Sequence, residues 1–274
     1  MGHKKVVRID PLTQALPPGG LDSHAHLDGE GFQEDLEATL ARAKACGVTT
    51  IINVFLHPND FAERMHIFDD HPEVFFILGV HPHDAETFGD RELAAIEEGF
   101  SKEPRLKALG EIGLDYFRMH SPRELQLAAF SAQLRLARKL DVPVAVHCRD
   151  AEADCLLVLE SEGFAGYPVL WHCFGGDTSL AQRVLRNGWH ISVPGPITYK
   201  GNDELRTAIA TIPEDRLLLE TDCPYLSPEP WRGQRNEPAF TVFTARAVAQ
   251  ACGRPPEEVW QKCGENARRF FRLA

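Results

Sequence analysis

The sequence of 274 residues lacks several features that define other classes of protein. No apolar run approaches the roughly 20 residues of a membrane-spanning helix, and the first twenty residues lack the apolar stretch of a secretion signal. Positive charge is in deficit, because 29 Lys and Arg oppose 40 Asp and Glu, for a formal net charge of -11. This balance argues against a broad electrostatic grip on nucleic acid or on an anionic membrane, but it allows a local cationic site.

The sequence also lacks paired cysteines. Its seven cysteines are an odd number and form no CxxC pair, which indicates reduced thiols and a cytoplasmic protein. Cys148, Cys173 and Cys223 each follow a His or an Asp directly, and in a strand they would point away from that neighbour. We therefore interpret these three as small packed hydrophobic residues and not as metal ligands.

Short apolar runs alternate with amphipathic stretches along the chain. The runs predict strands at 20–24, 48–54, 74–80, 106–110, 142–146, 167–171, 189–193 and 215–220, and helices include 33–46, 91–100, 122–140, 180–187, 237–251 and 257–271. Such alternation implies parallel strands, and eight units close into an α/β fold, the (β/α)₈ TIM barrel of about 250 residues. A doubly wound open sheet is the alternative, but no GxGxxG follows the first strand.

We expect a single domain over residues 20–274, with its active site at the carboxyl ends of the strands. Residues 1–19 form a short N-terminal extension, which the sequence Pro-Pro-Gly-Gly at 17–20 closes as a hinge.

The stretch LDSHAHLD, residues 21–28, places two histidines two residues apart at the end of the first predicted strand. Alternate side chains of a strand point the same way, so His24 and His26 would converge. Two neutral imidazoles suit a divalent metal. In a chain with twelve histidines, however, one HxH also arises by chance.

Residues able to bind metal follow six of the eight predicted strands. They are His24 and His26, His81, Glu111, His147, His172 and Asp222. Because the carboxyl ends of barrel strands surround one mouth, this distribution predicts a single cluster. His66, His71 and His190 lie elsewhere, and we interpret them as solvated or hydrogen-bonded histidines without a role in the site.

The cluster exceeds the needs of one tetrahedral zinc. Four of these histidines and the two carboxylates divide between two divalent ions if one carboxylate bridges them, and such sites activate water and clamp phosphate oxygens. Two ions, two carboxylates and one hydroxide sum to +1, which suits a phosphodiester anion.

Seven ordered blocks of the sequence resemble the TatD-type metal-dependent deoxyribonucleases, a family of amidohydrolase-like barrels. The blocks are DSHAHLD, GVHP, GEIGLDY, PVAVHCRDA, HCFGG, ETDCPYLSP with the following RGQRNEP, and NARRFF. The resemblance implies one metal held by His24, His26, Glu111 and Asp222, and a second held by Glu111, His147 and His172. It also implies substrate contact for His81, Arg149 and Arg232.

The resemblance and the chemistry agree on hydrolysis of DNA phosphodiesters by a metal-activated water. Glu111 would bridge two ions of Mg, Mn or Zn, and Asp222 would ligate one ion and take a proton from the water. We expect an exonuclease on short single-stranded ends, working as a monomer or a weak oligomer. For Glu220 we favour a structural role within its strand.

Basic and aromatic residues interleave in the loops predicted at the mouth. They are Arg118, Arg149, Lys200, Arg232 and Arg235, with Tyr116, Phe117, Phe174 and Trp231. Together they could hold a short single strand by phosphate contact and stacking. Alternatively, the aromatic residues pack the loops onto the barrel rim.

Two other functions remain open. The first is an ester or amide hydrolase on the same two-metal site, such as a D-aminoacyl-tRNA deacylase or a cyclic amidase. No lysine occupies a ligand position, and Lys107 lies too early in its strand, which disfavours an amidase with a carbamylated lysine but does not bear on a deacylase. The second is a metal-stabilised scaffold without catalytic activity.

Overall fold

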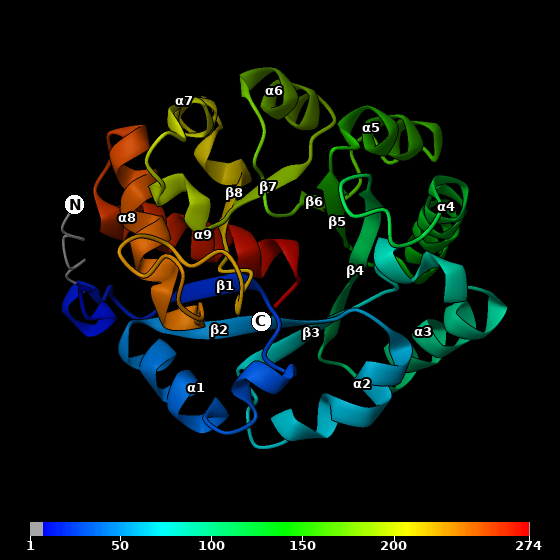
Figure 1. Cartoon of the computed structure of the whole chain (residues 1–274), viewed down its shortest axis with the longest axis horizontal. Coiled ribbons are helices and arrows are strands. Elements are labelled where there is room, and N and C mark those ends of the chain that lie inside the picture. Colours follow the sequence, from blue (N-terminus) through cyan, green and yellow to red (C-terminus); the bar gives the residue numbers. More distant parts are fainter. Residues whose placement is uncertain (1–7, 274) are drawn as a thin grey trace, which may run out of the picture.

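Residues 8–273 contain eight strands, which form one sheet in their order along the chain (Figure 1). All seven neighbouring pairs are parallel. In this computed structural model, which describes residues 8–273, the strands are β1 (Gly20–Ala25), β2 (Val48–Phe55), β3 (Val74–Leu78), β4 (Leu106–Asp115), β5 (Val144–Arg149), β6 (Val169–Trp171), β7 (His190–Val193) and β8 (Leu217–Leu219).

Helices follow the strands and form a ring outside them (Figure 1). They are α1 (Leu36–Ala45), α2 (Pro58–Arg64), α3 (Asp90–Lys102), α4 (Arg123–Leu140), α5 (Glu152–Ser161), α6 (Thr178–Arg186), α7 (Asp203–Ala210) and α8 (Thr241–Cys252), with α9 (Pro256–Phe270) last. Each of the six helical stretches proposed from the sequence corresponds to one of these helices. None of the described helices is long and apolar enough to cross a membrane.

The sheet closes where the chain leaving β8 meets β1. Ala25 forms a parallel bridge with Cys223, and the backbone N–H of Asp222 donates to the carbonyl oxygen of His24 at 2.9 Å. Buried Asp22 accepts bonds from the backbone and the hydroxyl of Thr221 at 2.9 and 2.6 Å. The sheet is therefore a nearly closed barrel, which confirms the predicted (β/α)₈ class.

Helix α9 closes the end of the barrel opposite the mouth. Ala267, Phe270 and Phe271 pack into one buried cluster with side chains from seven strands: Leu21, Ile52, Val54, Ile77, Ala108, Ala145, Leu170 and Leu218. The barrel floor is thus apolar, because burying these side chains removes them from water. Polar side chains can face inward only above this layer.

In three of the strands, regular alternation of side chains leads from this apolar layer to the residues of the site. Ala145 is followed two residues later by His147, and Leu170 by His172. Leu218 is followed in the same way by Glu220. These side chains reach the mouth by the period of two that defines a strand.

Strands β1 and β4 break that alternation. The pairing of β1 with β2 is irregular between Asp22 and Ala25, and that of β4 with β5 between Leu109 and Ile112. A bulge of this kind re-aims the following side chains. Strand β4 continues to Asp115 and does not end near residue 110 as predicted, so Glu111 lies inside the strand at its irregular point.

Gly113 permits the close approach of β4 to β5 beyond that point. Its φ is +143°, a conformation that favours glycine. A Cβ built there would overlap the carbonyl oxygen of His147. A side chain at this position would push the two strands apart next to the mouth.

The described part of the N-terminal extension packs along the outer helices. The Trp260 indole of α9 donates to the carbonyl oxygen of Pro17 at 2.8 Å, and the Arg246 guanidinium of α8 donates to that of Gln14 at 3.1 Å. Leu16 is buried. Residues 1–7 of the extension lie outside the described residues, and its separation from a domain at 20–274 stays a prediction.

Candidate metal centre

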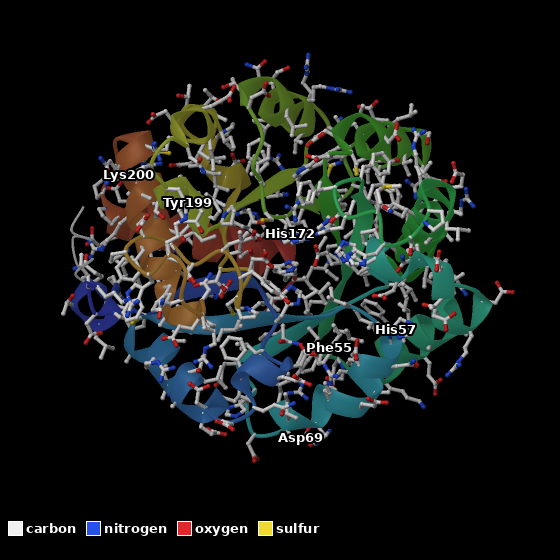
Figure 2. The ribbon with its side chains drawn as sticks, viewed as in Figure 1. Phe55, His57, Asp69, His172, Tyr199 and Lys200 are labelled. Atoms are coloured by element: carbon white, nitrogen blue, oxygen red, sulfur yellow. The ribbon has the colours of Figure 1, made fainter. Side chains whose placement is uncertain are left out.

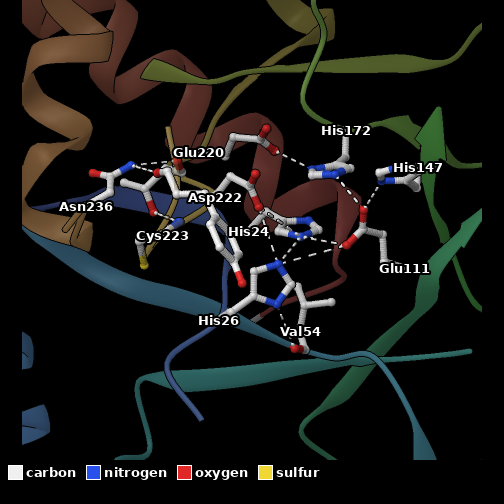
Figure 3. A network of polar contacts seen from close by, with 12 residues as sticks. His24, His26, Val54, Glu111, His147, His172, Glu220, Asp222, Cys223 and Asn236 are labelled. Carbon is white, nitrogen blue, oxygen red and sulfur yellow. Dashed lines mark hydrogen bonds and ion pairs between the residues drawn. The ribbon is translucent and has the colours of Figure 1, made fainter. Parts of the chain in front are cut away.

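The side chains predicted to form a cluster meet at the mouth of the barrel, where Glu111 contacts four histidines (Figure 3). Glu111 Oε2 faces the first pair of histidines, at 3.3 Å from His24 Nε2 and 4.0 Å from His26 Nε2. Glu111 Oε1 faces the second pair, at 2.5 Å from His147 Nδ1 and 2.8 Å from His172 Nε2. The two oxygens of the Glu111 carboxylate therefore contact two different pairs of imidazoles.

Asp222 lies beside the first pair (Figure 3). Its Oδ1 is 3.3 Å from His26 Nε2 and 3.8 Å from His24 Nε2. Those two imidazole nitrogens are themselves 3.2 Å apart, so the HxH residues converge as expected. Asp222 has a left-handed backbone with φ of +57°, uncommon for a residue other than glycine and often found at functional sites.

Several subsets of these residues have the spacing of a metal site. Three groups place one ligand atom of each residue within 4.8 Å of the others: His24, His172 and Asp222; His24, His26 and Glu111; and His81, Glu111 and His147. Within residues 8–273, no such group contains a cysteine. Of the three cysteines interpreted as packed residues, Cys223 is buried, whereas Cys148 and Cys173 are partly buried. Burial raises the pKa of the thiols of Cys173 and Cys223 well above the usual range.

Three of the histidines have one nitrogen free to bind a metal, because the other meets an oxygen acceptor. His172 Nδ1 lies 3.3 Å from Glu220, His147 Nε2 3.1 Å from Asp115, and His26 Nδ1 3.3 Å from the carbonyl oxygen of Val54. Metal-binding histidines in proteins are usually oriented in this way. This arrangement fits a metal centre. His24 Nδ1, by contrast, is buried and has no partner among the described residues.

His81 shows the opposite arrangement. Its Nδ1 accepts a bond from the backbone N–H of His83 at 3.1 Å, so the neutral ring carries its proton on Nε2. That nitrogen is 3.7 Å from Glu111 Oε1. Burial, reinforced by His147, holds the pKa of His81 well below its usual range, which favours the neutral ring. His81 therefore presents a donor to the centre.

The charges of the buried cluster depend on one another. Burial by itself raises the pKa of a carboxyl group, but His172, His147 and His24 outweigh it and hold the pKa of Glu111 well below its usual range. Burial lowers the pKa of an imidazole, but Glu111 and Glu220 outweigh it for His172, whose pKa is well above its usual range. The pocket between these carboxylates thus favours positive charge.

Two carboxylates outside the predicted ligand set support it. Glu220, which follows β8, is fully buried, and its Oε2 lies 3.3 Å from His172 Nδ1, so it contacts the candidate centre; a structural role within its strand stays a prediction. Asp115, at the end of β4, is 1% exposed. Its Oδ1 accepts from the backbone N–H groups of Phe117 and Arg118, while Oδ2 faces His147 at 3.1 Å and His83 at 3.0 Å.

Two residues of the centre that the sequence analysis did not include, His83 and Asp115, have a signal in the sequence. His83 stands two residues after His81, which repeats the spacing of the first HxH, and Asp115 falls within the GEIGLDY block. Tyr225, within ETDCPYLSP, was also overlooked. Its side chain is among the exposed large hydrophobic ones, at 62%, and its ring centroid is 6.1 Å from that of His26.

Two arginines predicted to contact substrate rest on aromatic rings. The Arg149 guanidinium lies 3.9 Å from the ring centroid of Phe117, and that of Arg232 lies 4.2 Å from the ring centroid of Tyr199. Both arginines are exposed, and Phe117 is 54% exposed. Basic and aromatic groups therefore do interleave in these loops.

Other loop residues serve packing, as the alternative interpretation held. Phe174 is fully buried, and the Trp231 ring stacks on Phe240 at 4.9 Å between centroids. Arg235 is paired with Asp35 at 2.7 Å, and its role as a loop cation for nucleic acid stays a prediction. Of these side chains, only Phe174 is closed off from a strand by burial.

Tyr116 is committed in the same way. Its hydroxyl donates to Asp154 at 2.6 Å and accepts from Arg123 at 3.0 Å. A phenol that is bonded on both sides has no free donor or acceptor for a substrate.

The three histidines placed outside the site differ from one another. His66 is exposed and His71 bonds to Glu37 at 2.9 Å, as expected. His190, at the start of β7, is half-buried. Its Nδ1 is buried without a partner among residues 8–273, and the ring packs 5.2 Å from Phe270. The reason is that β7 enters the barrel next to α9.

A (β/α)₈ barrel with histidines and carboxylates at the carboxyl ends of its strands is the architecture of a metal-dependent hydrolase. Comparison with known proteins agrees with this class. The family model described as TatD related DNase matches residues 21–272, and the chain belongs to that family.

Relatives match over nearly their whole length. YabD of Bacillus subtilis, named an uncharacterized metal-dependent hydrolase, is 36% identical over 252 residues, which covers 92% of this chain and 98% of YabD. A 3'-5' ssDNA/RNA exonuclease TatD of Erwinia billingiae is 35% identical over 258 residues, with 92% and 98% covered. The solved structure of YjjV, a TatD homologue of Escherichia coli, superposes with a TM-score of 0.85 at 28% identity and covers 96% of this chain and 100% of YjjV.

Proposed function

We propose that this chain is an exonuclease that hydrolyses phosphodiester bonds at the ends of single-stranded DNA with two divalent metal ions. The observation that carries the proposal is the position of Glu111, because each of its two oxygens faces a different pair of histidines. The choice of substrate is supported by a relative named for 3'-5' exonuclease activity on single-stranded DNA and RNA.

The proposed ligands divide between the ions as follows. One ion is held by His24, His26, Glu111 and Asp222, and the other by Glu111, His147 and His172. This division follows which oxygen of Glu111 each histidine faces. It also follows which imidazole nitrogen remains free when the other nitrogen bonds to Val54, Asp115 or Glu220. Nitrogen and carboxylate oxygen together suit Zn or Mn, and the carboxylates also suit Mg.

When bound, such cations acidify a water molecule and neutralise charge on the phosphate. Asp222 Oδ1 is the proposed acceptor of the proton from the attacking water. Its side chain is 15% exposed against 4% for Glu111, so Asp222 is the more accessible of the two carboxylates. Glu111 meets imidazoles with both of its oxygens, and it holds the ligand pairs in place.

His81 is the proposed donor to a phosphate oxygen. Its proton resides on Nε2, which faces the centre, whereas a metal ligand would need that nitrogen free of hydrogen. Its neutral state means that it can donate without placing an additional positive charge among the cations. Substrate contact is therefore a better assignment for His81 than metal ligation.

The proposed DNA contacts lie around the mouth. Arg149 and Arg232 bind phosphates away from the reacting bond, and the exposed rings of Phe117 and Tyr225 stack on bases. So few contacts suit a short single-stranded end and offer no sequence readout. We also propose a cytoplasmic location, supported by seven free cysteines; a monomeric or weakly oligomeric state stays a prediction.

The experiment is a metal-titrated activity screen of the apoprotein with Mg, Mn and Zn. The substrates are end-labelled single-stranded DNA, duplex DNA, bis(4-nitrophenyl) phosphate and an aminoacyl ester. Release of mononucleotides from single strands, with weaker cleavage of duplex, supports the proposal. Turnover of the ester without either phosphodiester would instead identify a deacylase, and binding of metal without any turnover would identify a scaffold.

A further inference from the structure

A second polar cavity lies beside the mouth, between the chain that follows β7 and helix α8. Its volume is about 570 Å³, which is within the range of small-molecule sites. Thr198, Tyr199 and Lys200 line one side, and Arg246 of α8 lines the other. None of the residues assigned to the metal centre lines this cavity.

The cavity is positively charged in a protein of net charge -11. Lys200, Arg206 and Arg246 line it, against one carboxylate, Glu229. Arg206 is paired with Asp203 at 2.6 Å. No carboxylate within residues 8–273 lies within ion-pair distance of Lys200 or Arg246, so the charges of these two residues are available to a ligand.

Arg246 also has an unsatisfied donor. One of its terminal nitrogens donates to the carbonyl oxygen of Gln14, but its Nε is buried and has no acceptor among the described residues. A buried guanidinium N–H without an acceptor is costly and unusual in folded proteins.

The cavity is connected to the mouth through Tyr199. The Tyr199 ring lines the cavity and carries the Arg232 guanidinium at 4.2 Å, while its hydroxyl donates to the carbonyl oxygen of Ser227 at 2.9 Å. In the view of Figure 2, Tyr199 lies between His172 at the centre and Lys200 near the edge. A strand that extends outward from the metal centre past Arg232 would reach this cavity.

We infer that the cavity binds a phosphate group of the DNA strand several nucleotides away from the bond that is cut, through Lys200 and Arg246. The inference rests on the proposed function, since it assigns the ligand from that substrate. A free nucleotide carries the same phosphate chemistry, so the test must separate the two sources.

The test compares Lys200→Gln and Arg246→Gln with the wild type and with the control Lys102→Gln, an exposed cation on α3. Metal-loaded protein is titrated with fluorescent oligothymidylates of three and ten nucleotides whose phosphorothioate linkages resist hydrolysis. Each cavity variant is expected to weaken binding of the ten-nucleotide strand about 3- to 10-fold and to leave the trinucleotide within twofold. The slope of log affinity against log salt should fall by about 0.7 for each lost phosphate contact.

Arg246→Lys distinguishes charge from structure, because it keeps the charge and should retain most of the affinity for the ten-nucleotide strand. Equal weakening of both lengths, or no difference from Lys102→Gln, would overturn the inference.

Calorimetry with inorganic phosphate and adenosine monophosphate provides the second arm. Arg246→Gln could abolish binding of these two ligands and leave binding of the ten-nucleotide strand unchanged. In that case the cavity is a nucleotide site, and the inference that the DNA strand reaches it is wrong. If the wild type binds phosphate there but neither binds nor cleaves DNA, the proposed function fails while the phosphate site stands.

Discussion

At the scale of single residues, Glu111 decides whether the centre holds two ions. Its Oε2 lies 3.3 Å from His24 Nε2, and its Oε1 lies 2.8 Å from His172 Nε2. A bridging carboxylate uses both oxygens and its negative charge to hold two cations that repel each other. Replacing this residue should therefore affect both sites, whereas replacing a histidine should affect one.

Glu111→Gln is expected to weaken the binding of both ions at least 10- to 100-fold, because substitution of residues that only orient the ligands already lowers metal affinity that much. His172→Ala should mainly empty the second site. The measurement is metal content per chain by mass spectrometry after dialysis, together with the rate of DNA hydrolysis. If Glu111→Gln retains two equivalents and near-normal turnover, the bridge is wrongly assigned.

The carboxylates behind the histidines provide a second test. Glu220→Gln and Asp115→Asn preserve volume but remove the anionic acceptors that orient His172 and His147. Metal affinity should fall about 10- to 100-fold, with one ion affected more than the other. Competition with a metal-binding dye measures this, and Glu152→Gln, exposed on α5, is the control. Affinities equal to the control would limit both residues to a structural role.

At the scale of elements, the strands position the proposed metal ligands and the loops carry the proposed substrate contacts. His147 and His172 each lie two residues after an apolar residue of β5 or β6 whose side chain belongs to the barrel floor. Arg149 and Arg232 instead rest on aromatic rings at the rim. Chemistry and substrate binding should therefore respond separately to mutation.

Arg149→Ala and Arg232→Ala are expected to raise KM for single-stranded DNA several-fold more than KM for bis(4-nitrophenyl) phosphate. The small diester lacks the flanking phosphates that these arginines contact in the proposed function. Steady-state kinetics on both substrates measures the difference. Equal losses on the two substrates would place the arginines at the reacting bond or show them to be structural.

At the scale of the whole molecule, the core and the metal centre are separate. The apolar floor, made of strand side chains and of residues at the end of α9, contains none of the proposed ligands. Removal of metal with EDTA is therefore expected to abolish hydrolysis and to leave the far-UV circular dichroism spectrum at room temperature largely unchanged. Loss of that spectrum on chelation would make the ions structural.

Stability against acid depends on His190 at the far end of the barrel. Burial, with Arg216 and Arg269 nearby, lowers the pKa of His190 to about 4. The unfolded chain, with a pKa near 6.5, then binds a proton that the folded protein does not bind between pH 6.5 and 4. Folding stability should thus be complete above pH 6.5 and decline as the pH falls toward 4.

His190→Gln removes this contribution. On lowering the pH from 7 to 4.5, the variant should therefore lose about 1–2 kcal/mol less of its free energy of unfolding than the wild type loses. Urea denaturation at both pH values measures it, with the exposed His66→Gln as control. An unchanged pH dependence in His190→Gln would show that the proton binds elsewhere.

The sequence by itself determined the barrel and the members of the cluster. Alternating strands and helices predict parallel strands, and parallel strands in a barrel bring their carboxyl ends to one mouth. Locating His147 and His172 required only the period of two within β5 and β6, because side-chain direction in a regular strand is a local property. The strand ends therefore predicted which residues would meet without any knowledge of their contacts.

Only the tertiary structure decided how those residues face one another. The irregular points in β1 and β4, which aim His24 and Glu111 inward, arise from pairing with neighbouring strands and have no local signature. The burial of Phe174 and the contact between Glu220 and His172 likewise depend on segments far apart in sequence. Periodicity gives the direction of a side chain along a regular strand, whereas register and burial depend on the packing of the whole barrel.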